Sequence, residues 1–183
     1  MIKRKPNRLR NCDYSQSGYY FVTICTIGRK EFFGDIREAR MELNRHGEIV
    51  NQCWYDLPRH YPNCSLDSFV IMPNHIHGII AIDNENVGGN GFKPFPTHGL
   101  PEMIRGFKTF SSRRINERIL GKNRFAWQKS FYDHIVRSEK SLGLIREYTQ
   151  NNPLKWDLDR ENPLSENFGL DHGRYWKEIY DDV

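Results

Sequence analysis

Two histidines lie one residue apart in the apolar stretch VIMPNHIHGII, residues 70–80. In a β-strand, successive side chains alternate between the two faces, so His75 and His77 would point to the same side. Two imidazoles that converge in this way can supply two ligands to a metal ion. A surface strand with two solvated histidines would show the same pattern, so other parts of the chain have to decide between these interpretations.

A second pair of candidate residues lies near the end of a predicted helix. Tyr148 and Asn152 are four residues apart in SEKSLGLIREYTQNN, residues 138–152, so they would share one face of that helix. Ser138 is a suitable N-cap, and Pro153 ends the helix. Each residue of the pair also has a structural explanation, because helical tyrosines often pack in the core and asparagine often precedes proline at a helix end.

The distribution of charge favours a polyanionic partner. The formal net charge is +4, and the basic residues fall in two runs, of which one contains no acid and the other only Glu117. These runs are Lys3, Arg4, Lys5, Arg8 and Arg10, and then Arg105, Lys108, Arg113, Arg114, Arg118, Lys122 and Arg124. A single run is common on a solvated surface, whereas two runs in one small domain favour nucleic acid as the partner.

The cysteines and the hydropathy predict a cytoplasmic protein with reduced thiols. The four cysteines, Cys12, Cys25, Cys53 and Cys64, form no C-x-x-C pair, and no apolar segment follows the basic N-terminal residues. No window of about 18 apolar residues is present, so we expect no membrane span and no membrane partner.

The expected elements follow the order β-α-β-β-α-β-α. We predict strands at residues 18–28, 65–72, 75–82 and 131–137, helices at 37–58, 100–120 and 138–152, and a mobile loop at 83–99. The first six elements match the ferredoxin-like arrangement, an α+β fold in which an antiparallel sheet has helices on one face. Many functions use that fold, so the site residues must carry the functional argument.

Four motifs together resemble those of a known family. MPNHIHG, FKTFSSRRIN, WQKSFYDHIVR and REYTQNNPLKW, in this order and spacing, resemble the HUH single-strand DNA transposases with one tyrosine. The resemblance is closest to the REP-associated tyrosine transposases, relatives of the insertion-sequence-200 type. It covers about residues 15–157, which leaves a basic N-terminal arm at 1–14 and a C-terminal tail at 158–183. Aromatic residues scattered through the tail suggest that it packs on the domain.

The resemblance implies a role for each matched residue. His75 and His77 would bind a divalent metal, Mg²⁺ or Mn²⁺, and Asn152 would be the third ligand through its side-chain oxygen. Tyr148 would be the nucleophile that forms a covalent link to a DNA 5′-phosphate and releases a 3′-hydroxyl, which can later attack the link to complete strand transfer. Tyr132 is a rival nucleophile, but no amide lies one helical turn from it.

The implied partner is single-stranded or hairpin DNA. The residues that we expect to contact DNA are Lys3, Arg4, Lys5, Arg105, Lys108, Arg113, Arg114 and Arg137. A monomer is favoured over a homodimer that shares its active sites. Two other functions stay open: a metal-dependent phosphodiesterase that uses activated water, and a protein that binds DNA hairpins without cutting them.

Overall fold

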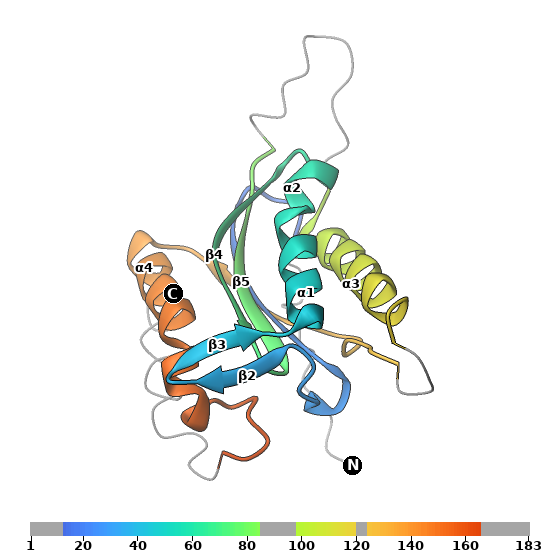
Figure 1. The fold of residues 1–183 in the computed structure, drawn as a ribbon. Helices are drawn as coiled ribbons and strands as arrows, with labels where there is room; N and C mark the ends of the chain where they lie inside the picture. Colours follow the sequence, from blue (N-terminus) through green and yellow to red (C-terminus); the bar gives the residue numbers. More distant parts are fainter. Residues whose placement is uncertain (1–12, 85–97, 120–123, 166–183) are drawn as a thin grey trace, which may run out of the picture.

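A computed structural model describes residues 13–84, 98–119 and 124–165 of the chain (Figure 1). The N-terminal arm up to residue 12, most of the expected loop at 83–99 and the tail from residue 166 lie outside the described residues. Among the described helices, none has the length and apolar character needed to cross a bilayer.

A four-stranded antiparallel sheet forms the centre of the fold. Its strands are β1 (Gly18–Cys25), β4 (Cys64–Met72), β5 (His75–Ile82) and β6 (Tyr132–Val136). They lie in the order β4-β5-β1-β6, so the first and third of these strands along the chain are the two central ones. This order, with a helix between β1 and β4 and another between β5 and β6, confirms the predicted ferredoxin-like arrangement.

One face of the sheet is covered by α1 (Arg45–Tyr55), α2 (Leu57–His60) and α3 (Leu100–Asn116). Trp54 of α1 is fully buried there, stacked on Phe69 with ring centroids 4.6 Å apart and in edge contact with Phe107 of α3. Gly78 makes this packing possible, because a Cβ atom at that position would collide with the Trp54 ring. The main hydrophobic core therefore fills the space between these helices and the sheet.

The opposite face is covered by α4 (Glu139–Asn151). Ser138 caps this helix as expected, since its hydroxyl accepts a hydrogen bond from the Ser141 amide. The apolar residues at the contact between α4 and the sheet form a small cluster: Phe21, Ile79, Val136, Leu142 and Ile145. Arg146 also holds α4 to the sheet through a bidentate pair with Asp67 of β4, at 2.8 and 2.6 Å.

The helix predicted at residues 37–58 begins later than expected. Residues 34–43 form a hairpin instead, made of β2 (Gly34–Arg37) and β3 (Arg40–Leu43). The turn residues Glu38 and Ala39 both have positive φ, which a helix does not allow. Asn44 then caps α1, because its side chain accepts hydrogen bonds from the backbone amides of His46 and Gly47. Met41 and Leu43, which the prediction assigns to a helical stripe, also fit the alternation of a strand.

Two short 3-10 helices complete the described elements. Residues Ile27–Arg29 (η1) follow β1, and Pro153–Leu158 (η2) follow α4. After η2 the chain turns back toward the sheet, and Asp159, Glu161 and Asn162 are buried there. This short segment, residues 159–162, matters for the site described next.

Candidate metal and nucleophile site

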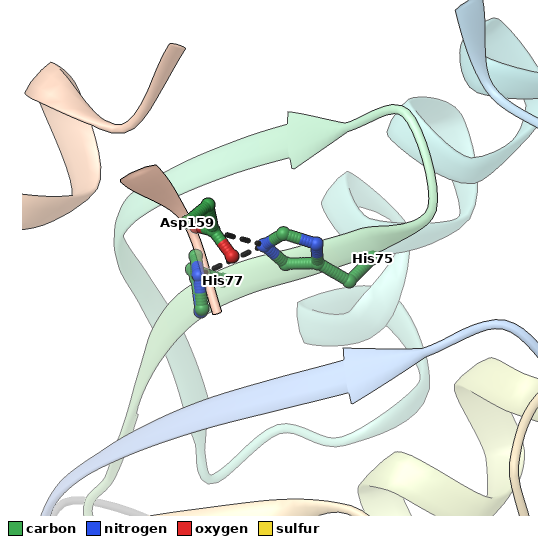
Figure 2. Close-up of side chains that lie close together, drawn as sticks. All are labelled: His75, His77 and Asp159. Carbon is green, nitrogen blue, oxygen red and sulfur yellow. Dashed lines mark hydrogen bonds and ion pairs between the residues drawn. The ribbon is translucent and has the colours of Figure 1, made fainter. Parts of the chain in front are cut away.

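The two histidines of β5 form the centre of the candidate site. Both side chains are buried on the α4 face of the sheet, with their Nε2 atoms 2.9 Å apart (Figure 2). Because β5 pairs with β1 on one side and β4 on the other, the strand cannot rotate to separate them. Because both histidines are buried, the alternative of a surface strand with two solvated histidines is wrong.

Each imidazole is held through its other nitrogen. Nδ1 of His75 lies 2.8 Å from Oδ1 of Asn74, and Nδ1 of His77 lies 2.8 Å from the hydroxyl of Thr23. Burial lowers the pKa of His75 to about 3, so its imidazole is neutral and one of its two nitrogens carries a lone pair. Neutral imidazoles anchored at Nδ1, with Nε2 facing a common point, are typical metal ligands.

Asp159 is a third donor that the sequence analysis did not identify. Its Oδ2 atom lies 3.8 Å from Nε2 of His75, and donor atoms of His75, His77 and Asp159 all lie within 4.8 Å of one another. Figure 2 shows the carboxylate approaching the two imidazoles from a separate segment of the chain. Its position depends on the turn back after η2, so no spacing in the sequence links it to the histidines.

Tyr148 reaches the same point from α4. Its phenol oxygen lies 3.4 Å from Nε2 of His77. Its ring packs edge-on against the ring of Phe21, with the two ring centroids 6.2 Å apart. The Phe21 ring stacks in turn on His77. The structure therefore brings the predicted nucleophile next to the predicted metal-binding histidines, although 70 residues of chain separate His77 from Tyr148.

Asn152 lies one helical turn beyond Tyr148 and is buried. Its side-chain oxygen has no hydrogen-bond partner among the described residues. A buried amide oxygen in that state is costly unless another group binds it, which fits a role as a metal ligand. The imidazole nitrogens of His75 and His77 with the carboxylate oxygen of Asp159 form a donor set that can bind a divalent metal.

A cavity of about 270 Å³ opens beside these residues. Its lining includes His77, Tyr148 and Asp159 of the candidate site, together with Tyr132 of β6 and Arg160. The Arg160 guanidinium lies over the exposed Tyr132 ring at 5.7 Å. Tyr132, the rival nucleophile, thus lines the same cavity, but of the two phenol groups it is that of Tyr148 that lies within 3.4 Å of a histidine nitrogen.

Four of the predicted DNA-binding residues lie on α3. Arg105 and Arg113 are exposed on α3, which covers the face opposite the histidines. Lys108 donates to the carbonyls of Gln128 and Ser130, and Arg114 pairs with Asp56 at 3.3 Å. Arg137 is exposed just after β6, whereas Lys3, Arg4 and Lys5 lie outside the described residues.

Comparisons with known proteins point to one family. No family model matches the chain. An uncharacterized protein of Haemophilus influenzae is 39% identical over 170 residues, which cover 86% of this chain and 92% of that protein. A second H. influenzae protein, named as a REP-associated tyrosine transposase, is 29% identical over 149 residues, covering 78% of this chain and 74% of its own length.

A solved structure has a similar fold. A solved structure of a REP-associated tyrosine transposase bound to a REP hairpin matches with a TM-score of 0.55 over 81% of this chain and 74% of that one, at 17% identity. The chain therefore belongs to one family with the uncharacterized H. influenzae protein, and the known proteins that it resembles in sequence and in fold are the REP-associated tyrosine transposases.

Proposed function

We propose that this chain is a divalent-metal-dependent transposase that cuts and rejoins single-stranded or hairpin DNA through Tyr148. The observation that carries the proposal is the position of the Tyr148 phenol oxygen, 3.4 Å from a histidine nitrogen that belongs to a cluster of metal donors. A nucleophile beside a metal site is the arrangement that phosphoryl transfer to a side chain requires.

His75, His77 and Asp159 would hold the metal, with Asn152 as a further ligand. A bound Mg²⁺ or Mn²⁺ would polarise the scissile phosphate, stabilise the negative charge that develops on it and favour the phenolate of Tyr148. Thr23 and Asn74 keep the two imidazoles oriented, and the burial of His75 keeps water away from its Nε2 atom.

The reaction consists of two displacements at one phosphorus atom. The Tyr148 oxygen attacks the phosphorus, the bond to the 3′-oxygen breaks, and that oxygen leaves with the electron pair and takes up a proton. The product is a 5′-phosphotyrosine and a free 3′-hydroxyl. In the second displacement a 3′-hydroxyl attacks the phosphorus and Tyr148 leaves, so the phosphodiester is restored without an external source of energy.

The cavity next to Tyr148 would hold the nucleotide at the cleavage point. Its volume of about 270 Å³ and the aromatic ring of Tyr132 beside Arg160 suit a base and its phosphate. The lining also contains the carboxylates of Asp133, Asp159 and Glu161, so a bound divalent cation would be needed to offset their charge near a phosphate. Arg105, Lys108, Arg113 and Arg114 lie on α3, so any contact that they make would be with DNA that extends past the opposite face. Since one chain supplies every residue of the candidate site, we propose a monomer.

The test uses hairpin oligonucleotides from the DNA that flanks the gene, labelled at either end and incubated with the protein and Mn²⁺. We expect a protein-linked, 5′-attached strand on a denaturing gel with the wild type and none with Tyr148→Phe. Tyr132→Phe is the matched control, because it removes a phenol from the same cavity and should keep the adduct. If the adduct disappears with Tyr132→Phe and persists with Tyr148→Phe, the nucleophile is wrongly assigned.

Two other outcomes correspond to the alternative functions. Cleavage by both the wild type and Tyr148→Phe, without any adduct, would indicate a phosphodiesterase that uses activated water. Tight retention of the hairpin without cleavage in Mg²⁺ or Mn²⁺ would indicate a hairpin-binding protein. The comparison with a structure of a hairpin-bound transposase makes hairpins the substrates to try first.

A further inference from the structure

Asn74, in the tight turn between β4 and β5, is fully buried and touches none of the atoms that react in the proposed mechanism. Its side chain makes three hydrogen bonds, all to segments that meet at the candidate site. The amide nitrogen donates to the backbone carbonyls of Arg29 and Glu161, at 3.1 and 2.7 Å, and the amide oxygen faces Nδ1 of His75 at 2.8 Å. The side chain thus joins η1, the β4–β5 turn and the segment 159–162.

These contacts determine the protonation of His75. The two carbonyls accept hydrogen bonds only, so the Asn74 nitrogen must point to them and the oxygen must point to the imidazole. Because an amide oxygen cannot donate, Nδ1 of His75 must carry the proton. The Nε2 lone pair of His75 is then directed at His77 and Asp159.

Asn74 also holds the segment that brings Asp159 to the site. It bonds to the carbonyl of Glu161, whose own amide donates to Oδ1 of Asp159. The Glu161 carboxylate pairs with Arg29 at 2.9 Å, so two of these segments, η1 and residues 159–162, are also joined directly. The carboxylate of Asp159 consequently depends on Asn74 for its place beside His75.

We propose that Asn74 is a positioning residue that couples two of the metal donors: it fixes the tautomer of His75 and anchors the segment that carries Asp159. The inference rests on the metal site of the proposed function. Residues of this kind, one bond removed from a metal ligand, typically contribute about 10- to 100-fold to metal affinity.

Thr23 provides the matched comparison. Its hydroxyl lies 2.8 Å from Nδ1 of His77, but a hydroxyl can either donate or accept, so it does not impose a tautomer. Thr23 lines the same cavity as residues 159–161, but within the described part of the chain no hydrogen bond joins its side chain to that segment. Thr23→Val should therefore weaken the hold on His77 and leave the segment in place.

The experiment compares Asn74→Ala, Asn74→Asp and Thr23→Val with the wild type in three measurements. Long-range ¹H–¹⁵N spectra of the metal-free protein report the tautomer of His75, hydrogen exchange reports the docking of residues 159–162, and calorimetric titration with Mn²⁺ reports metal affinity. None of them uses DNA or cleavage, so they remain informative if the assignment of Tyr148 fails.

We expect Asn74→Ala to lose the single Nδ1–H tautomer, to speed exchange at the Glu161 amide and to weaken Mn²⁺ binding about 10- to 100-fold. Asn74→Asp keeps the oxygen that faces His75 but removes both donors, so it should retain the tautomer and still speed exchange. This variant also keeps the test valid if Asn74→Ala does not fold.

Three results would overturn the inference. The tautomer and the exchange could be unchanged in Asn74→Ala, Mn²⁺ affinity could stay within twofold of the wild type, or Thr23→Val could loosen residues 159–162 as much as the Asn74 variants do. If the wild type binds no Mn²⁺ at all, the metal site is wrong, and the tautomer and exchange data alone decide whether Asn74 links the two segments.

Discussion

The two faces of the central sheet bury different kinds of residues. Between the sheet and α1 and α3 lies a broad apolar layer with large aromatic rings, including Trp54, Phe107 and Trp127. Under α4 the apolar cluster is small, and beside it the polar groups Thr23, His75 and His77 are buried. The comparison indicates that the first face supplies most of the stability, whereas the second gives up apolar burial to hold chemically active groups.

The largest effect on stability is expected from Trp54→Ala on the α1 face. Removal of this fully buried, stacked indole should lower the free energy of unfolding by about 3–5 kcal/mol, measured by urea denaturation. The adduct formed per folded molecule should not change, because Trp54 packs on the face opposite the histidines. Exposed Gln52 on the same helix is the control, and Gln52→Ala should change stability by less than about 0.5 kcal/mol.

Ile145→Ala on the α4 face should lower stability less than Trp54→Ala does, but it should also lower activity. Ile145 is fully buried, and its truncation should cost about 2–3 kcal/mol, since a small cluster can relax around the lost atoms. Because the same helix carries Tyr148, the yield of adduct per folded molecule should also fall. If Trp54→Ala reduces that yield as much as Ile145→Ala does, the proposed division between the faces is wrong.

The smallest effect on stability is expected when the ion pair between Arg146 and Asp67 is removed. Both side chains are partly exposed, so the pair should contribute about 1 kcal/mol or less. The hydrogen bonds from Arg146 lower the pKa of Asp67 in the folded state. The contribution should therefore be complete above the unfolded-state pKa of about 3.9 and should disappear as the pH falls below it.

A double-mutant cycle with Asp67→Asn and Arg146→Ala measures this contribution. The coupling energy should be constant from pH 5 to pH 8 and should approach zero near pH 2, as followed by urea denaturation at each pH. A coupling energy that grows on acidification would contradict the assigned direction of the Asp67 pKa shift.

Most of the fold could be predicted from local patterns. The four sheet strands, α3 and α4 have unambiguous periodicity, and Ser138 and Pro153 mark the ends of α4 in the sequence. The β2–β3 hairpin was missed because its turn, Glu38-Ala39, contains neither glycine nor asparagine, although both residues have positive φ. Asn44 was the signal that could have placed the start of α1.

The candidate site was only partly predictable, for a different reason. His75 and His77 share a strand face, and Tyr148 and Asn152 share a helix face, so local geometry relates the members of each pair. Asp159 is placed by a reversal of the chain after η2 and by bonds from Asn74 and Arg29 to Glu161, which are contacts between distant segments. Local periodicity contains no information about such contacts.

The buried thiol of Cys25 lies against Glu161, in the segment that also carries Asp159. Its sulfur lies 3.5 Å from a carboxylate oxygen of Glu161, and burial raises the pKa of the thiol. While residues 159–162 are docked, the sulfur is shielded from oxidants and alkylating reagents, since a buried thiol reacts poorly. Because Asp159 and Glu161 belong to one short segment, undocking of residues 159–162 would take Glu161 away from this sulfur, and faster alkylation of Cys25 would report that movement.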